Sequence, residues 1–312
     1  MSASTLPTTI PIRSGSEPPL VLPPDALLVF RARAERFEQL AVGHALGDWL
    51  RFLGRLTEVQ HQLLANYPVI ALPTTDALAL AQQHRMPMLS AQDWVRDPVW
   101  RDALTRLCVE LAAQAPATAL ADLQRLQALP PDQVEALAER VLHTDFVGPD
   151  TSLLPYVAAA LQVHWTAAAT RLPALTQVLD SPGVCPCCGY LPVASVVKAA
   201  GEVANLRYLH CALCNTEWNL VRVKCAACDA TESVSYRMLE EADATRREAV
   251  RAETCDTCHS YLKIIYQEKG GVDPVADDLA TLALDLLLDQ ADYGRAGPNL
   301  LLMPGEQSLV SA

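Results

Sequence analysis

The sequence predicts an α+β protein in which an N-terminal all-helical domain precedes two small cysteine-rich modules in tandem and a C-terminal helix. Two observations lead to this expectation. Alanine and leucine dominate the first half of the chain and recur there at helical spacing. In the second half, eight of the ten cysteines form four Cys-x-x-Cys pairs within one stretch of 74 residues, among short apolar runs typical of strands.

The N-terminal part is expected to consist of a tail and a helical domain. Residues 1–24 are rich in proline, serine and threonine, which predicts an extended tail, and residues 25–180 are expected to form the helical domain. Proline and glycine separate its expected helices. These cover 25–65 (as one helical stretch), 76–84, 97–114, 117–128, 131–142 and 152–178. Cys108 lies in an apolar helical run, so we expect it to be a small core residue.

Ser181-Pro182-Gly183 marks the change from helices to short strands. We divide the following region into a first module, residues 181–224, and a second module, residues 225–272. Strands are expected over 191–197, 206–210, 217–223, 234–239 and 261–266. Short hairpins with Cys-x-x-Cys turns are typical of rubredoxin-like and zinc-ribbon modules. Because such modules contain little core, a bound metal would supply much of their folding free energy.

Four Cys-x-x-Cys pairs, separated by 22, 10 and 26 residues, carry the expected chemistry. Two facing pairs complete the tetrahedron of thiolates that zinc or iron accepts. The short middle gap is typical of a connection between two sites, and an interleaved pairing (first turn with third, second with fourth) stays open. The expected metal ligands are Cys185, Cys188, Cys211 and Cys214 for the first ion and Cys225, Cys228, Cys255 and Cys258 for the second.

The residue that follows each pair supports this interpretation. These residues are Gly189, Asn215, Asp229 and His259, which are among the types that most readily adopt a positive φ. A metal knuckle needs a positive φ near this point, because its backbone N–H groups must turn back toward the sulfur. We therefore predict a left-handed conformation at all four positions.

Other uses of the cysteines fit less well. A thioredoxin-like site needs only one pair, and disulfide scaffolds are typical of small secreted chains. Neither an apolar secretory segment nor a twin-arginine leader follows the first methionine, so a cytoplasmic location is expected. In Cys185-Pro-Cys-Cys188 the spacing makes Cys188 the ligand, which leaves Cys187 as a free thiol.

The charge distribution argues against nucleic acid as a partner. The formal net charge is −12, and residues 181–272 contain ten Lys and Arg against eleven Asp and Glu. A ribbon that binds nucleic acid is expected to carry a basic face. Arg246, Arg247 and Arg251 alternate with glutamates, which indicates a solvated helix or loop face. Since no uninterrupted apolar run reaches the length of a membrane span, membrane insertion is not expected either.

A helix and tail are expected over residues 273–312. Asp273 is a plausible N-cap and Pro274 a plausible first helical residue. The apolar stripe of this helix contains Val275, Leu279, Leu282 and Leu286, and its polar side contains Asp277, Thr281, Asp285 and Asp289. We expect the helix to pack on a neighbouring domain; the alternative is that its acidic side contacts a partner.

Enzymatic activity is not expected. The sequence contains no Ser-His-Asp arrangement, phosphate-binding glycine-rich loop or His-Glu-x-x-His motif. Sites with four thiolates also leave no open coordination position, which is typical of structural or electron-transfer sites. An electron carrier or redox sensor is therefore an alternative function, and a zinc ribbon that binds nucleic acid is a third.

Longer stretches around the knuckles resemble the FdhE family, the formate dehydrogenase accessory proteins. The similarity is dense from 185 to about 303 and extends to Arg31-Ala-Arg-Ala-Glu-Arg36. It is carried by Cys185-Pro-Cys-Cys-Gly-Tyr-Leu-Pro-Val-Ala-Ser195, Leu206-Arg-Tyr-Leu-His-Cys-Ala-Leu-Cys-Asn-Thr-Glu-Trp218, Val221-Arg-Val-Lys-Cys-Ala-Ala-Cys228, Tyr261-Leu-Lys-Ile-Ile-Tyr-Gln-Glu268 and Val275-Ala-Asp-Asp-Leu-Ala-Thr-Leu282.

The resemblance implies a cytoplasmic maturation factor that binds the molybdenum-containing catalytic subunit of formate dehydrogenase before its export. It also implies two mononuclear iron sites at the eight paired cysteines, although four thiolates suit zinc equally well. Two positions depart from the family pattern. Cys187 stands where a non-thiol residue is more usual, and His259 stands where glycine is frequent. Neither the pattern nor the resemblance predicts an oligomeric state.

Overall fold

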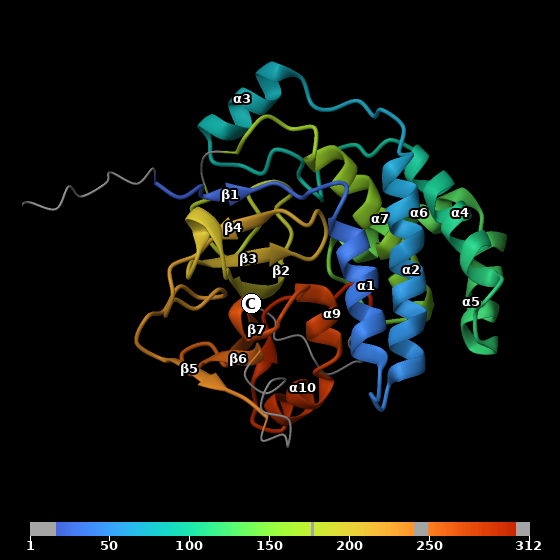
Figure 1. Ribbon diagram of the computed structural model, residues 1–312. Helices are drawn as coiled ribbons and strands as arrows, with labels where there is room; N and C mark the ends of the chain where they lie inside the picture. The colour runs from blue at the N-terminus through green and yellow to red at the C-terminus, as the bar shows by residue number, and fades with distance from the viewer. Residues whose placement is uncertain (1–16, 176–177, 240–248, 304–312) are drawn as a thin grey trace, which may run out of the picture.

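The computed structural model describes residues 17–175, 178–239 and 249–303. In Figure 1 the helices of the N-terminal half, apart from Thr75–Gln83, lie on the right and the strands lie on the left, while Thr75–Gln83 lies above the strands. The last two helices lie beside and below the strands. This arrangement confirms the predicted α+β class. None of the described helices is both long and apolar enough to span a bilayer.

The helical half is built around α7, Leu154–Ala169, in which every residue except Pro155 is buried. A helix that is apolar on all sides is expected at the centre of a core. It packs against α2, α4 and α6. The other helices are α1 Val29–Ala41, α2 Gly47–Ala65, α3 Thr75–Gln83, α4 Val99–Ala112, α5 Ala117–Ala128, α6 Pro131–Leu142 and the short 3-10 helix Thr151–Leu153.

Two expected helical ranges differ from the structure. The stretch 25–65 contains two helices, because Gly43, with φ +68°, reverses the chain between α1 and α2. The range expected to reach 178 ends at Ala169. Pro173 explains the early end, since proline has no N–H to donate and disfavours helical backbone in the residue before it.

One sheet joins the two cysteine-rich regions. Its strand order is β1-β4-β3-β2-β7-β6-β5, with β8 added beside β7. The parallel pairing of β2 with β7 links the first region to the second, while the hairpins within each region are antiparallel. The strands are β1 Val21–Leu22, β2 Pro192–Val197, β3 Arg207–Cys211, β4 Glu217–Asn219, β5 Val234–Arg237, β6 Val250–Cys255, β7 Ser260–Tyr266 and β8 Gly294–Arg295.

Three strands, β1, β6 and β8, were not expected. β1 comes from the proline-rich N-terminal stretch and pairs with β4 at the edge of the sheet. β6 contains Arg251, which the sequence analysis assigned to a solvated helix or loop face; Arg246 and Arg247 lie outside the described residues. The expectation of a helix or loop is wrong for Arg251, because the residue lies in a strand, is paired with Ile264 of β7, and places its guanidinium over the Tyr266 ring.

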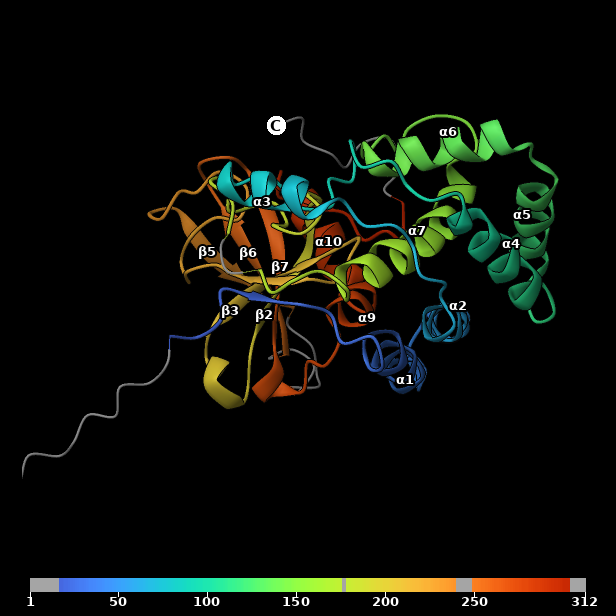
Figure 2. The same ribbon diagram turned by 90° about the horizontal axis from the view of Figure 1, so that it is seen from above.

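The predicted C-terminal helix is divided into α9, Pro274–Leu279, and α10, Leu282–Asp289. The ammonium group of Lys263 lies at the break and donates to the carbonyl groups of Asp278 and Thr281 at 2.8 and 3.1 Å. Asp273 caps α9 as predicted, since its carboxylate accepts from the backbone N–H groups of Val275 and Ala276. Figure 2 shows α9 between the strands and α1, and it packs on β2, β7 and α1.

Of the three carboxylates predicted on the polar side of this segment, Asp277 and Asp285 are held in ion pairs, and Asp289 is exposed. Asp277 is buried in an ion pair with Arg36, and Asp278 is buried between Lys263 and Arg295. Because these carboxylates are neutralised inside the protein, the alternative in which the acidic side contacts a partner does not hold for them. Leu286, expected in the apolar stripe, has 66% of its surface exposed instead.

Candidate metal centres

The eight paired cysteines gather into two groups of four. In each group, the four sulfur atoms all lie within 4.8 Å of one another. The first group contains Cys185, Cys188, Cys211 and Cys214, and the second contains Cys225, Cys228, Cys255 and Cys258. The sulfurs are therefore grouped sequentially and not in the interleaved pattern.

The sulfur spacing fits a tetrahedral metal ion. A metal–thiolate bond of about 2.3 Å places the sulfurs of a regular tetrahedron about 3.8 Å apart. In the first cluster two Sγ–Sγ distances are 3.5 and 3.4 Å, and in the second two are 3.7 Å. Backbone N–H groups of Leu213 and Cys214 each donate to Cys211 Sγ at 3.4 Å, as expected for a metal knuckle. Either cluster could hold one zinc or iron ion.

All four predicted left-handed residues have the expected backbone conformation. The φ angles are +74° at Gly189, +59° at Asn215, +67° at Asp229 and +52° at His259. At Gly189 the lack of a side chain is required for a second reason, because a Cβ would lie 2.8 Å from the Pro87 ring.

Burial opposes ionisation of the thiols in both clusters. Burial raises the pKa of Cys185 and Cys188 well above the usual range, and contacts with neighbouring thiols add to the effect. In the second cluster burial also opposes ionisation of Cys255, but hydrogen bonds from Ser233 and from backbone N–H groups lower its pKa to about 6. Adjacent thiols cannot all be charged without a compensating ion. A divalent metal supplies that charge.

The first cluster is enclosed by the helical half. All four sulfur-bearing residues are fully buried. Backbone N–H groups of Leu89 and Ala91 donate to the carbonyl groups of Cys187 and Cys188 at 2.7 and 2.8 Å. From α7, the Gln162 amide donates to the Ala212 carbonyl at 2.7 Å. These bonds fix the first cluster to the loop after α3 and to the central helix.

The second cluster lies near the surface. Cys225 and Cys255 are buried, whereas Cys258 is half-buried and Cys228 is exposed. Two hydroxyl groups approach its sulfurs, with Ser260 Oγ 3.0 Å from Cys258 Sγ and Ser233 Oγ 3.6 Å from Cys255 Sγ. Hydroxyl groups at such distances orient thiolates and adjust the properties of a bound metal.

The two remaining cysteines lie outside both four-sulfur groups. Cys187 is fully buried beside the first cluster, on the turn between two members of that cluster. Cys108 is buried in α4, and burial raises the pKa of its thiol to about 12. A protonated thiol in an apolar helix face agrees with the predicted core role.

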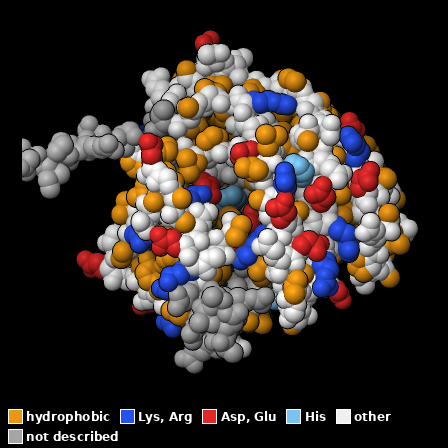
Figure 3. Space-filling model, viewed as in Figure 1, with side chains coloured by type: hydrophobic (Ala, Val, Ile, Leu, Met, Phe, Trp, Pro, Cys, Tyr) orange, Lys and Arg blue, Asp and Glu red, His pale blue; other side chains and the backbone are white. Residues whose placement is uncertain are grey.

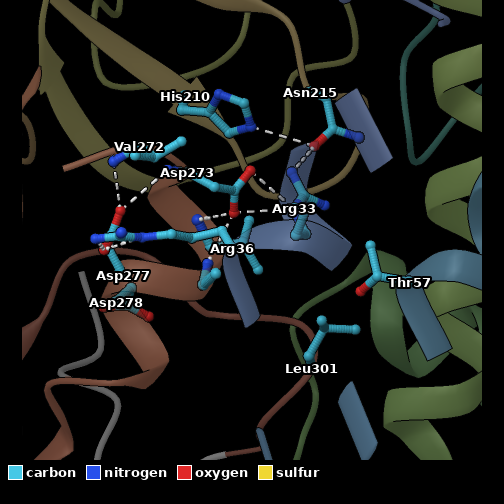
Figure 4. Close-up of polar contacts among 12 residues, drawn as sticks. Arg33, Arg36, Thr57, His210, Asn215, Val272, Asp273, Asp277, Asp278 and Leu301 are labelled. Atoms are coloured by element: carbon cyan, nitrogen blue, oxygen red, sulfur yellow. Dashed lines mark hydrogen bonds and ion pairs between the residues drawn. The ribbon is translucent and has the colours of Figure 1, made fainter. Parts of the chain in front are cut away.

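A buried polar network, which the sequence analysis missed, surrounds the second turn of the first cluster (Figure 4). Asn215 Oδ1 accepts 2.7 Å from Arg33 Nη2 and lies 3.2 Å from His210 Nε2. The Asn215 amide donates to Thr166 Oγ1 of α7 at 2.8 Å, and Arg33 also pairs with Asp273. Arg33 and Arg36 lie in a predicted helix and could have suggested buried ion pairs. The sequence does not indicate their acidic partners, which lie some 240 residues away.

Charged side chains of both signs are mixed on the face of the molecule seen in Figure 3. On the face seen in Figure 3, the described Lys and Arg side chains lie singly or beside Asp and Glu, without a continuous basic patch. Nucleic acid needs such a patch for its phosphate contacts. The charges on this face are therefore not arranged to bind a phosphate backbone.

Family models match nearly the whole described chain. The model for the FdhE N-terminal region matches residues 18–179, the model for the FdhE central domain matches 184–222, and the model for the FdhE C-terminal domain matches 223–302.

Similar full-length proteins carry the same family name. A "Protein FdhE homolog" from Edwardsiella ictaluri is 42% identical over 94% of this chain and 95% of its own length. One from Cronobacter sakazakii is 37% identical over 93% and 92%, respectively. A solved structure, the FdhE protein from Pseudomonas aeruginosa, superimposes with a TM-score of 0.77 at 35% identity, covering 92% of this chain and 99% of that chain.

Proposed function

Because this chain belongs to the FdhE family of formate dehydrogenase accessory proteins, we propose that it is a maturation factor that binds the catalytic subunit of formate dehydrogenase in the cytoplasm before export. The observation that carries the proposal is the match along the full chain, including both four-cysteine clusters. A chaperone-like role needs a binding surface and no catalytic centre. The closed thiolate clusters are consistent with that requirement.

In this proposal the eight clustered cysteines are metal ligands. The sulfur spacing and the positive-φ knuckles both fit one ion per cluster. The family resemblance favours iron, and the same geometry accepts zinc. A bound ion would join the turn before β2 to the turn between β3 and β4 at the first cluster, and the turn before β5 to the turn between β6 and β7 at the second.

Co-purification tests the main proposal. An affinity-tagged chain is expressed in its native host under conditions that induce formate dehydrogenase, and the eluate is analysed by mass spectrometry and for metals. The catalytic subunit is expected in the eluate at near-stoichiometric amounts, with about two metal ions per chain. Deletion of the gene should abolish formate oxidation. Normal formate oxidation in the deletion strain, together with an eluate that lacks the catalytic subunit, would refute the proposal.

An electron carrier or redox sensor is the second candidate, favoured by the shallow position of the second cluster. Cys228 is exposed and Cys258 half-buried, so an iron ion there would lie close to an electron-transfer partner. Iron held by four thiolates changes oxidation state without losing ligands. This function requires a reversible visible absorbance change on reduction. A colourless zinc-loaded chain that still restores formate oxidation would exclude it.

A further inference from the structure

The two four-cysteine clusters differ in how far they are from solvent. In the first cluster, all four sulfur-bearing residues have zero exposed surface. In the second, Cys228 is exposed and Cys258 is half-buried. Both clusters have the same four donor atoms, so the difference in exposure is a difference in the access of solvent to the sulfurs.

The backbone hydrogen bonds of the two clusters also differ. The first knuckle is held from outside by Leu89 and Ala91, and Tyr190 donates to the Val141 carbonyl of α6 at 2.6 Å. The knuckles of the second cluster bond within their own region and to the following C-terminal segment. Cys225 N–H donates to the Ala230 carbonyl at 2.8 Å, and Gly294 N–H donates to the His259 carbonyl at 2.8 Å.

An open cavity of about 970 Å³ reaches the second cluster. Its lining includes Cys228 and Cys258 on one side and Asp180, Thr144 and Arg295 on others. None of the first cluster's four cysteines lines it. A molecule much larger than water can therefore approach the second cluster's sulfurs without any unfolding.

Metal exchange depends on such an approach. A competing ligand forms a bond to the ion while a thiolate leaves, and the thiolate then takes a proton from water; the divalent ion departs with the new ligand. The reaction needs an exposed edge at which the incoming donor and a leaving thiolate can both reach solvent. The second cluster has this edge at Cys228, and the first cluster lacks one.

We propose that the second cluster is an exchangeable metal site, entered through the cavity at Cys228 and Cys258, and that the first cluster is a permanent structural site. The proposal rests on the assignment of both clusters as metal sites. The ligands that fit the cavity are small chelators and the thiolates of another protein's metal site, because both compete for a thiophilic ion. The first cluster thus stabilises the fold, and the second cluster exchanges metal.

A chelation and labelling experiment tests the proposal with the full-length chain. The chain is loaded with two zinc ions per molecule and mixed with the coloured chelator 4-(2-pyridylazo)resorcinol, and samples are pulsed with N-ethylmaleimide. One ion should be released at least tenfold faster than the other. Mass spectrometry should then find the maleimide on Cys225, Cys228, Cys255 and Cys258 while the four cysteines of the first cluster remain unlabelled. Equal release rates, or earlier labelling of the first cluster, would overturn the proposal.

A cavity variant and a matched control sharpen the test. Ala227 is exposed, lies between two ligand cysteines and lines the cavity, whereas Glu232 is exposed in the same region and does not line it. Ala227→Trp should slow the fast release several-fold, and Glu232→Trp should leave it unchanged. A fast phase equally rapid in both variants would contradict entry through the cavity. If a variant does not fold, the labelling order in the unaltered chain still decides. Because no catalytic subunit is present, the result is independent of the proposed maturation role.

Discussion

Arg33 of α1 donates a 2.7 Å hydrogen bond from Nη2 to Oδ1 of Asn215, the positive-φ residue that follows the ligand-bearing turn ending at Cys214. The Nε of the same guanidinium donates to both carboxylate oxygens of Asp273, at 3.1 and 3.2 Å. Asp273 in turn caps α9. The buried Arg33 side chain therefore connects α1 to the first cluster and to α9 through hydrogen bonds.

Replacement of Arg33 by methionine should destabilise the fold strongly. The substitution leaves the buried Asp273 carboxylate without its ion-pair partner, and breaking a buried pair in this way typically costs about 3–5 kcal/mol. Urea unfolding of the metal-loaded chain measures the change. Arg31→Met is the matched control on the same helix, because the Arg31–Glu35 pair is solvent-exposed and should contribute less than about 1 kcal/mol. Similar losses in the two variants would show that the buried network does not stabilise the fold.

Glycine substitutions at two left-handed residues should have different effects. Asn215→Gly keeps the backbone conformation but removes the partners of Arg33 and Thr166, so a loss of about 2 kcal/mol or more is expected. His259→Gly removes the left-handed strain of a non-glycine residue, about 1–2 kcal/mol, and adds the backbone entropy of glycine, about 0.5–1 kcal/mol. Its stability should therefore stay within about 1 kcal/mol of the unaltered chain. Urea unfolding of both variants, metal-loaded, checks the contrast; equal losses would contradict it.

The features that were predicted correctly from the sequence are local ones. The four knuckles follow from the spacing of two cysteines and the φ preference of the next residue, and all four positive φ angles are observed. The cap at Asp273 likewise depends only on its own side chain and the following two N–H groups. Such features need no knowledge of distant partners.

Two of the missed features depend on distant charged partners. The alternating charges of Arg251 and Glu253 indicated a solvated segment, yet Glu253 is buried because Arg207 of β3 reaches it across the sheet. The break between α9 and α10 depends in the same way on Lys263 of β7. Charge alternation in a sequence does not show whether each charge faces water or a buried counter-charge.

Serine substitutions at two adjacent cysteines should separate a metal ligand from a neighbouring thiol. Cys188→Ser should reduce the bound metal from two ions per chain to one, because Cys188 belongs to the first four-sulfur group. Cys187→Ser should retain two ions, since Cys187 lies outside that group although it is equally buried. Mass spectrometry of purified chains for metal content, with Cys108→Ser as a control for loss of a buried thiol, checks this. Retention of both ions by Cys188→Ser would identify Cys187 as the ligand.

His164 should make the stability of the chain depend on pH. Its ring is fully buried in α7, stacked on Trp94 with 5.4 Å between ring centroids, and its Nδ1 lies 2.9 Å from the Tyr67 hydroxyl. Burial lowers the pKa of His164 from 6.5 to about 4. Between these values the unfolded chain binds a proton that the folded chain does not bind. The stability contribution is therefore complete above pH 6.5 and decreases as the pH falls toward 4.

This contribution should amount to about 3 kcal/mol, because one pKa unit corresponds to about 1.4 kcal/mol and the pKa shift is 2.5 units, from 6.5 to about 4. Metal binding by thiolates also depends on pH, so the measured quantity is a difference between two metal-loaded chains. His164→Asn keeps a polar atom near Tyr67 and removes the titrating ring, and its unfolding free energy should fall less steeply between pH 6.5 and 4 than that of the unaltered chain. His84→Asn, at an exposed position, should retain the original steepness. Parallel profiles for His164→Asn and the unaltered chain would exclude His164 as the source of the pH dependence.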